Sequence, residues 1–144
     1  MGYEVRKAET NGEIAAIENM QFDIDVVREE FRFDPKEFFR WVIAMRQQIG
    51  DKIVVFYVID TSKKKPVGVL VAADFRVNPI CDFGTAMFYY SKAPNNFNDE
   101  MIAMGIEHMK RLGVTEIRIE TKNPRLYTRY GFKKTQHVVM TKGL

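Results

Sequence analysis

The chain of 144 residues has little of several features that would mark a specialised class of protein. It holds one cysteine, Cys81, so no disulfide framework can form, and a chain of this length can bury a core without one. No apolar run approaches the roughly 20 residues that a helix needs to cross a bilayer. Charged residues interrupt the N-terminal segment, where a secretory signal needs an apolar stretch. We therefore expect a cytoplasmic protein with no membrane partner.

The chain also lacks a strong charge of one sign. Its 22 Lys and Arg against 19 Asp and Glu give a net charge of +3. Nucleic-acid binders usually carry a denser basic cluster, so we do not expect a nucleic-acid partner. The 11 Phe and 6 Tyr are too many for a disordered chain. No repeat or linker divides the sequence, which predicts a single domain over residues 1–144.

What is present is a clear succession of strand and helix patterns. The run IVVFYVI at 53–59 is typical of a strand buried on both faces. Thr10 or Asn11 can begin one helix, and Asp34-Pro35 can begin another that Gly50 ends. The buried stripe expected for that second helix is Phe38, Trp41, Val42 and Met45. The expected strands are 3–8, 53–59, 68–75, 85–90, 114–119 and 132–140; a long helix spans 97–112 and a short one opens at Asn123-Pro124.

The order of these elements indicates the fold class. Strands and helices alternate as β-α-α-β-β-β-α-β-α-β, so antiparallel strands are followed by a β-α-β crossover. This predicts an α/β protein with a mixed central sheet of about six to seven strands and helices on both faces. Residues 21–32 fit either a helix or a loop.

Three short motifs within this order resemble a known family. Residues 126–132 (LYTRYGF) match the pattern L-Y-x-x-x-G-F; residues 110–114 (KRLGV) end a helix before a strand; and residues 66–71 (PVGVLV) open a central strand. In this order, the chain resembles the GNAT superfamily of acyl-CoA-dependent N-acetyltransferases. The resemblance implies acetyl-CoA as co-substrate, a small-molecule or peptide amine as acceptor, and compatibility with a homodimer.

The resemblance also implies where the cofactor lies. In the family, free backbone groups of the strand before the long helix hold the pantetheine arm, and the pyrophosphate sits on the helix N-terminus. The cofactor would then contact Tyr89, Tyr90, Ser91, Lys92, Asn96, Phe97, Asn98 and Asn123. The family loop reads roughly R-x-x-G-x-G, and here Ala93, Asn96 and Asn98 occupy its three defining positions. Asp99 and Glu100 follow at the helix start, where they would repel a pyrophosphate.

The chemistry needs an acid, a base and a place for the amine. Tyr127 falls on the family position that protonates the departing thiolate, and its alternative role is that of a core tyrosine. A carboxylate near the central strands would serve as base, for which Asp82 and Glu120 are the candidates, and both can equally be solvated surface groups. The segment between the first two helices would bind a cationic amine through Asp23, Asp25 and Glu29, or would simply form a charged amphipathic helix.

Two functions of different classes remain open from the sequence. The first is an N-acetyltransferase with Tyr127 as acid. The second is a protein with the same fold that has lost catalysis and serves as a binding or structural component, which the unmatched phosphate loop favours. His108, His137 and Cys81 show no metal-ligand spacing, so no metal is expected.

Overall fold

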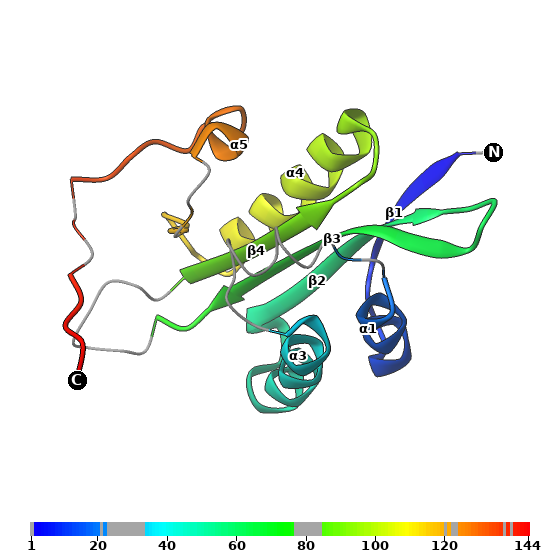
Figure 1. Cartoon of the computed structure of the whole chain (residues 1–144), viewed down its shortest axis with the longest axis horizontal. Coiled ribbons are helices and arrows are strands. Elements are labelled where there is room, and N and C mark those ends of the chain that lie inside the picture. Colours follow the sequence, from blue (N-terminus) through cyan, green and yellow to red (C-terminus); the bar gives the residue numbers. More distant parts are fainter. Residues whose placement is uncertain are drawn as a thin grey trace.

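The computed structural model of the chain describes residues 2–20, 22, 34–76, 85–119, 121, 124–136, 138 and 140–144. They form an antiparallel sheet with helices against both of its faces (Figure 1). Within them, no helix has both the length and the apolar character needed to cross a membrane. In chain order the elements are β1 (Tyr3–Lys7), α1 (Asn11–Glu18), α3 (Pro35–Ile49), the 3-10 turn η1 (Gly50–Lys52), β2 (Ile53–Asp60), β3 (Lys65–Asp74), β4 (Thr85–Ser91), α4 (Asn95–Arg111) and α5 (Pro124–Thr128).

The sheet runs in the order β1-β2-β3-β4, and each neighbouring pair is antiparallel. Strand β2 has a neighbour on each edge and helices over each face, which explains its nearly continuous burial. At the other side of the sheet, Gly68 of β3 lies opposite Ser91 at the end of β4. A Cβ atom at Gly68 would lie 2.3 Å from Ser91 Oγ. The end of β4 therefore packs so closely on β3 that Gly68 has no room for a side chain.

The helix starts predicted from local patterns are confirmed. The Thr10 hydroxyl accepts a hydrogen bond from the Glu13 N–H (3.2 Å), and the Glu13 carboxylate accepts one from the Thr10 N–H (3.3 Å). This reciprocal capping box satisfies backbone donors that a helix otherwise leaves unpaired. Asp34 accepts a hydrogen bond from the Lys36 N–H (2.9 Å), and Gly50 ends α3 with a φ of 60°. Such a left-handed residue favours glycine.

The buried stripe of α3 differs from the predicted one. Phe39 and Val42 are fully buried, whereas Trp41 is 45% exposed and Phe38 is half-buried. Phe39 meets Phe88 of β4 edge to face (6.2 Å between ring centroids), while Trp41 stacks on Phe38 at the margin (6.0 Å). Because apolar residues occupy most positions between 38 and 45, the pattern allowed more than one rotation of the helix, and packing against the sheet chose this one.

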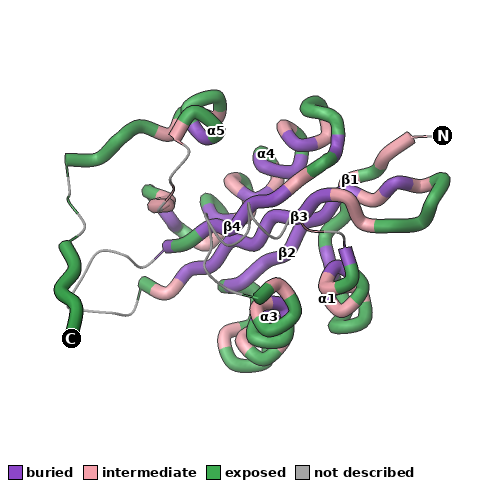
Figure 2. The backbone as a smooth tube through the Cα atoms, viewed as in Figure 1, coloured by how far each residue is buried: buried purple, intermediate pink, exposed green. Residues whose placement is uncertain are grey.

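Two cores lie on opposite faces of the sheet (Figure 2). Alternate side chains of β2 supply them: Val55 and Tyr57 join α1 and α3, and Val54, Phe56 and Val58 join α4 and α5. Helix α4 packs closely on the sheet at Gly105, where a Cβ atom would lie 2.3 Å from Leu70 Cδ2. The predicted arrangement of helices on both faces is therefore confirmed.

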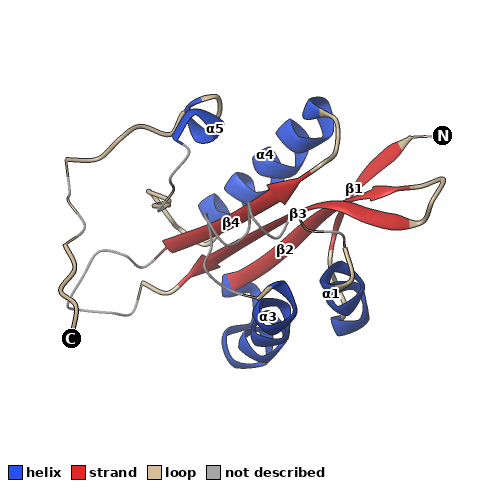
Figure 3. Cartoon of the chain, viewed as in Figure 1, coloured by secondary structure: helices blue, strands red, loops and turns tan. Residues whose placement is uncertain are grey.

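The predicted α/β class is confirmed, but the described sheet has four strands, all antiparallel, where about six to seven in a mixed sheet were expected. Residues 114–119, and the described residues after 131, are not strands (Figure 3). Within the predicted last strand, Phe132 is half-buried against Tyr127, whereas Val138 and Met140 are 81% and 89% exposed. Residues 117–119 are half-buried against the α4 side, but they contact β4 through a side chain instead of a ladder of backbone bonds. A run of β-branched residues forms a strand only where a neighbouring strand pairs with it.

Candidate active site

Strand β4 is an edge strand of the described sheet, and no other described strand pairs with its outer side. It pairs only with β3, and the Lys92 N–H donates to the Val67 carbonyl oxygen (2.8 Å). Backbone groups alternate in direction along a strand, so those of Tyr90 also face β3. Those of Tyr89 and Ser91 therefore face the free edge. Of the three predicted contact residues on β4, Tyr89 and Ser91 therefore direct backbone groups to the outer edge, and Tyr90 does not.

The segment after α4 runs beside the start of this edge and no further. The Thr85 hydroxyl donates to the Glu116 carbonyl oxygen (3.0 Å) and accepts a hydrogen bond from the Arg118 N–H (3.1 Å). In the described part of the chain, no backbone hydrogen bond continues this pairing toward Tyr89 or Ser91. Among the described residues, the outer edge of β4 is therefore bonded at Thr85 and has no bonded neighbour near Tyr89 and Ser91.

The turn from β4 into α4 is shaped by a buried asparagine. The Ser91 hydroxyl donates to Asn98 Oδ1 and accepts from the Ala93 N–H (3.0 Å), and Asn98 Nδ2 donates to the Ala93 carbonyl oxygen (3.0 Å). Asn98 is only 4% exposed. Its side chain, predicted as a cofactor contact, holds the turn from within.

This turn also explains how the loop can lack the family's glycines. Among the described residues, positive φ angles occur at Lys64 and at glycines 2, 50, 113 and 131, and none lies between 91 and 98. Because the backbone here stays in regions that any residue adopts, Asn96 and Asn98 replace glycine without strain. The hydrogen bonds of Ser91 and Asn98 give the turn its shape instead.

The N-terminus of α4 has backbone donors to offer. Pro94 is the N-cap and supplies no side-chain bond, while the N–H groups of Phe97 and Asn98 bond back to its carbonyl oxygen. In the described part of the chain, no hydrogen bond uses the N–H of Asn95 or Asn96. Free N–H groups and the helix dipole favour an anion at this position. The Asn96 side chain is exposed there, and the half-buried Phe97 instead packs on Tyr3 (5.4 Å).

Asp99, which the sequence analysis expected to repel a pyrophosphate, forms an ion pair. Its Oδ2 accepts a hydrogen bond from Arg129 Nη2 at 2.7 Å, in an ion pair between α4 and the turn after α5. Both side chains are about half-exposed. The Arg129 guanidinium lowers the pKa of the Asp99 carboxyl, which is therefore ionised and neutralised by its partner. The charge that would oppose a pyrophosphate is offset by a cation.

Tyr127 lies beside the open end of β4. It is 3% exposed, and its ring meets those of Tyr89 (6.5 Å) and Phe132 (5.7 Å) edge to face. Burial, followed by the neighbouring Tyr130, raises the pKa of Tyr89, while burial and then Asp99 raise that of Tyr130. Tyr89 and Tyr130 are therefore protonated at neutral pH. The structure brings Tyr127, Tyr89 and the α4 turn together.

The remaining predicted residues are placed less favourably or are not described. The Tyr90 side chain lies on the opposite face, against Phe22 (5.0 Å), and Lys92 is exposed. Asp74, a further carboxylate near the central strands, accepts two hydrogen bonds from the Arg76 guanidinium and one from the Arg76 N–H, and the guanidinium lowers its pKa. Asp23, Asp25, Glu29, Asp82, Glu120 and Asn123 lie outside the described residues. Sequence reasoning missed Asp99 with Arg129, since thirty positions separate them.

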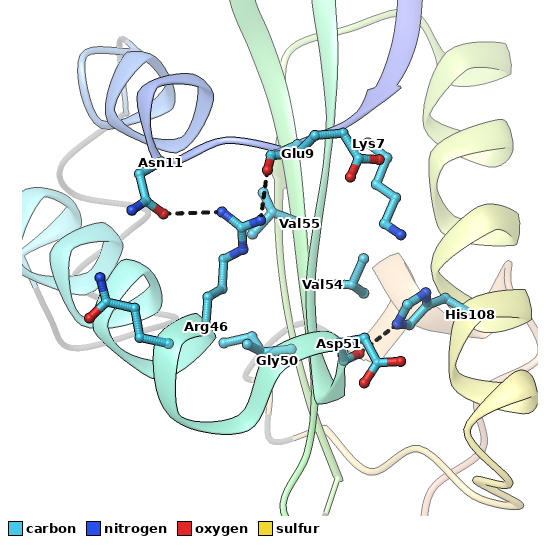
Figure 4. A pocket seen from close by; sticks show the side chains of 12 residues that line it. Lys7, Glu9, Asn11, Arg46, Gly50, Asp51, Val54, Val55 and His108 are labelled. Carbon is cyan, nitrogen blue, oxygen red and sulfur yellow. Dashed lines mark hydrogen bonds between the residues drawn. The ribbon is translucent and has the colours of Figure 1, made fainter.

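A cavity of about 470 Å³ opens far from this site, beside the end of β1 (Figure 4). Arg46 donates to Asn11 Oδ1 (3.2 Å) and to the Glu9 carbonyl oxygen (3.1 Å) across one wall, and His108 Nε2 is hydrogen-bonded to the Asp51 carbonyl oxygen (2.7 Å). The wall includes the start of β2, which is level with the start of β4 in the register of the sheet. The α4 turn follows the other end of β4.

No protein-family model matches the sequence, and no curated protein matches it either. Solved structures do match the fold. The aminoglycoside N-acetyltransferase AAC(6')-Iy, in complex with a bisubstrate analogue, aligns over 100% of this chain and 99% of its own, with a TM-score of 0.68 and 12% identity. Glucosamine-6-phosphate N-acetyltransferase from Arabidopsis thaliana aligns over 99% of each chain, with a TM-score of 0.59 and 15% identity. The chain has the GNAT fold.

A third matching structure was solved with a ligand. A predicted acetyltransferase from Clostridium acetobutylicum, solved with acetyl-CoA, aligns over 97% of this chain and 96% of its own, with a TM-score of 0.59 and 17% identity. At such identities the likeness is one of fold alone. Among the described residues, no strand pairs with the outer edge of β4, no hydrogen bond uses the first N–H groups of α4, and Tyr127 packs on Tyr89 of β4.

Proposed function

We propose that the chain is an N-acetyltransferase that moves an acetyl group from acetyl-CoA to a primary amine by direct attack. The observation that carries the proposal is the position of Tyr127 beside the free edge of β4, next to an uncapped helix N-terminus in a GNAT fold. Acetyl-CoA supplies an activated thioester, whose carbon–sulfur bond breaks as the carbon–nitrogen bond of the amide forms.

The residues of this chain would have three tasks. The outward N–H groups of Tyr89 and Ser91 would donate to the thioester oxygen, where negative charge develops during the reaction. The Tyr127 hydroxyl would give its proton to the departing sulfur, a thiolate of basicity close to that of a phenolate. A carboxylate, for which Asp82 and Glu120 are the candidates, would remove the proton that the amine loses, directly or through water.

The acceptor is an amine whose identity is open. Two of the matching proteins are named for amine substrates, an aminoglycoside and glucosamine 6-phosphate. Asp23, Asp25 and Glu29 would attract a cationic amine in this chain. We propose a small molecule or a peptide as acceptor, in the cytoplasm.

The test combines binding with turnover. Calorimetric titration with acetyl-CoA should show micromolar binding, and an acceptor screen should then find an amine that is acetylated. Replacing the hydroxyl in Tyr127→Phe should lower turnover about 10²- to 10⁴-fold, the usual worth of a general acid, and leave acetyl-CoA affinity nearly unchanged. Tyr57→Phe is the matched control, because its hydroxyl bonds to Glu13 on the other face of the sheet.

The results separate the two candidate functions. Full turnover in Tyr127→Phe would remove that tyrosine as the acid while leaving the enzyme intact. No binding of acetyl-CoA at millimolar concentration would favour the second candidate, a GNAT-fold protein that has lost catalysis and binds a partner. The specific observation behind that alternative is the burial of Asn98 inside a loop that lacks the family's arginine and glycines.

A further inference from the structure

The proposed function leaves one charge unaccounted for. The family loop carries an arginine before the long helix, and this chain has Ala93 there. The α4 N-terminus offers N–H groups but only a partial positive charge, whereas a pyrophosphate is a multiply charged anion. Lys92 is nearby and exposed, but no described hydrogen bond or ion pair holds its side chain in place.

Arg129 is held at this end of α4 by its ion pair with Asp99. In a helix the Cα–Cβ bonds tilt toward the N-terminus, and residues four apart share a face, so the Asp99 carboxylate lies over the turn that begins at Asn95. The guanidinium bonded to that carboxylate at 2.7 Å therefore lies over the first turn of α4. This is the turn in which, among the described residues, no hydrogen bond uses the N–H of Asn95 or Asn96.

The guanidinium keeps most of its donors available there. In the described part of the chain its side chain makes one hydrogen bond, from Nη2 to Asp99, and about half of the side chain is exposed. Its carbon Cζ lies over the Tyr130 ring, 5.8 Å from the ring centroid, within the range of a cation–π interaction. A guanidinium has five N–H donors in a rigid fork, and the remaining ones suit phosphate oxygens.

We propose that Arg129, supplied by the turn after α5, replaces the missing loop arginine and binds the phosphates of acetyl-CoA, with Asp99 as its positioning residue. This inference rests on the proposed function and names how its co-substrate is held. The proposal also gives Asp99 a role in phosphate binding. Its carboxylate by itself would repel a phosphate, but it holds the Arg129 guanidinium over the helix N-terminus, where the guanidinium attracts one. The cation arrives from a distant part of the sequence and not from the loop.

The experiment is calorimetric titration of the intact chain with CoA, with pantetheine as a ligand that lacks phosphate. Arg129→Gln should weaken CoA binding about 10- to 100-fold, the usual worth of hydrogen bonds to a charged group, and leave pantetheine affinity unchanged. Arg125→Gln is the matched control, because Arg125 is an exposed arginine in α5 with no described side-chain partner. Thermal unfolding of each variant checks that it is folded.

Asp99→Asn distinguishes two roles of the carboxylate, because the two roles predict opposite changes in CoA affinity. If Asp99 positions Arg129, its loss should weaken CoA binding, although the change removes a negative charge from the site. If Asp99 acts only by its charge, the same variant should bind CoA more tightly, which would overturn the positioning role. Raising the salt concentration should lower CoA affinity less steeply in Arg129→Gln than in the parent, because one phosphate contact is gone.

The role of Arg129 and the acetyltransferase activity can be tested separately. If the parent chain binds CoA and Arg129→Gln binds it as tightly as Arg125→Gln does, the assignment of Arg129 is wrong and the acetyltransferase proposal stands. If the parent binds neither acetyl-CoA nor CoA at millimolar concentration, the proposed function fails and the assignment falls with it.

Discussion

Gly68→Ala should destabilise the protein through one identifiable contact. An added Cβ would lie 2.3 Å from Ser91 Oγ and 2.9 Å from Ser91 Cβ, both shorter than van der Waals contact allows. Gly68 has no positive φ, so alanine meets no backbone strain and the contact alone opposes it. The Ser91 hydroxyl cannot simply rotate away, because it bonds to Asn98 and to the Ala93 N–H.

The magnitude follows from opposing contributions. Overpacking of this kind costs about 1–3 kcal/mol, and each hydrogen bond that Ser91 gives up costs about 0.5–1.5 kcal/mol. Replacing glycine also restricts the unfolded chain, which returns about 0.4–1 kcal/mol. We expect a net loss of about 1–3 kcal/mol in the free energy of unfolding, measured by urea denaturation with an unchanged m-value.

Two further variants test whether the contact between Gly68 and Ser91 causes this loss of stability. Gly12→Ala in α1 is the control, since its Cβ would meet only Thr10 Oγ1 at 3.8 Å, and it should stabilise the helix by about 0.5–1 kcal/mol. Combining Gly68→Ala with Ser91→Ala removes the closest contact, so the double variant should lose less than the sum of the single losses. If Gly68→Ala is as stable as the parent, the close packing of β3 on the end of β4 is wrong.

Three other substitutions test the scaffold around the site. Arg76→Gln should cost about 1–3 kcal/mol at pH 7, because it leaves the buried Asp74 carboxylate without its cation. Since Arg76 lowers the pKa of Asp74, the stabilisation by this ion pair is complete above pH of about 4 and is lost as the pH falls through the lowered pKa. Equal destabilisation by Arg76→Gln at pH 7 and pH 2.5 would contradict this. Thr10→Ala should cost about 1 kcal/mol by urea denaturation, since it removes half of the capping box with Glu13, and no loss would show that the cap is idle. Gly105→Ala should lower the melting temperature, because its Cβ would lie 2.3 Å from Cδ2 of the fully buried Leu70, and displacing a core side chain costs about 1–3 kcal/mol against a gain of about 0.5–1 kcal/mol for replacing a helical glycine. An unchanged value would argue against this close approach of α4.

Much of the fold could be predicted because its signals are local. A capping box joins residues three apart, and Asp34 with Pro35 begins a helix through bonds within its own first turn. The strand at 53–60 is recognisable from its apolar run because it is covered on both faces. The pattern L-Y-x-x-x-G-F likewise pointed to Tyr127, which the structure places beside β4.

The sequence-based predictions failed where contacts between different elements of the fold determined the structure. Residues 114–119 have the composition of a strand, yet their described contact with β4 runs through the Thr85 side chain. Trp41 has the spacing of a core residue, but the rotation of α3 leaves it at the margin. Asn98 was expected to face a phosphate and instead lies inside the turn, bonded to Ser91 and Ala93.

The sequence by itself determined the helix caps, the central strands and the position of Tyr127 in its motif, because each depends on neighbours within a few residues. Only the tertiary structure decided the charge at the α4 N-terminus. Asp99 read alone is a repulsive group, and it becomes half of an ion pair because the turn after α5 brings Arg129 to within 2.7 Å of it. Long-range electrostatics depends on distance in space, which separation along the chain does not reveal.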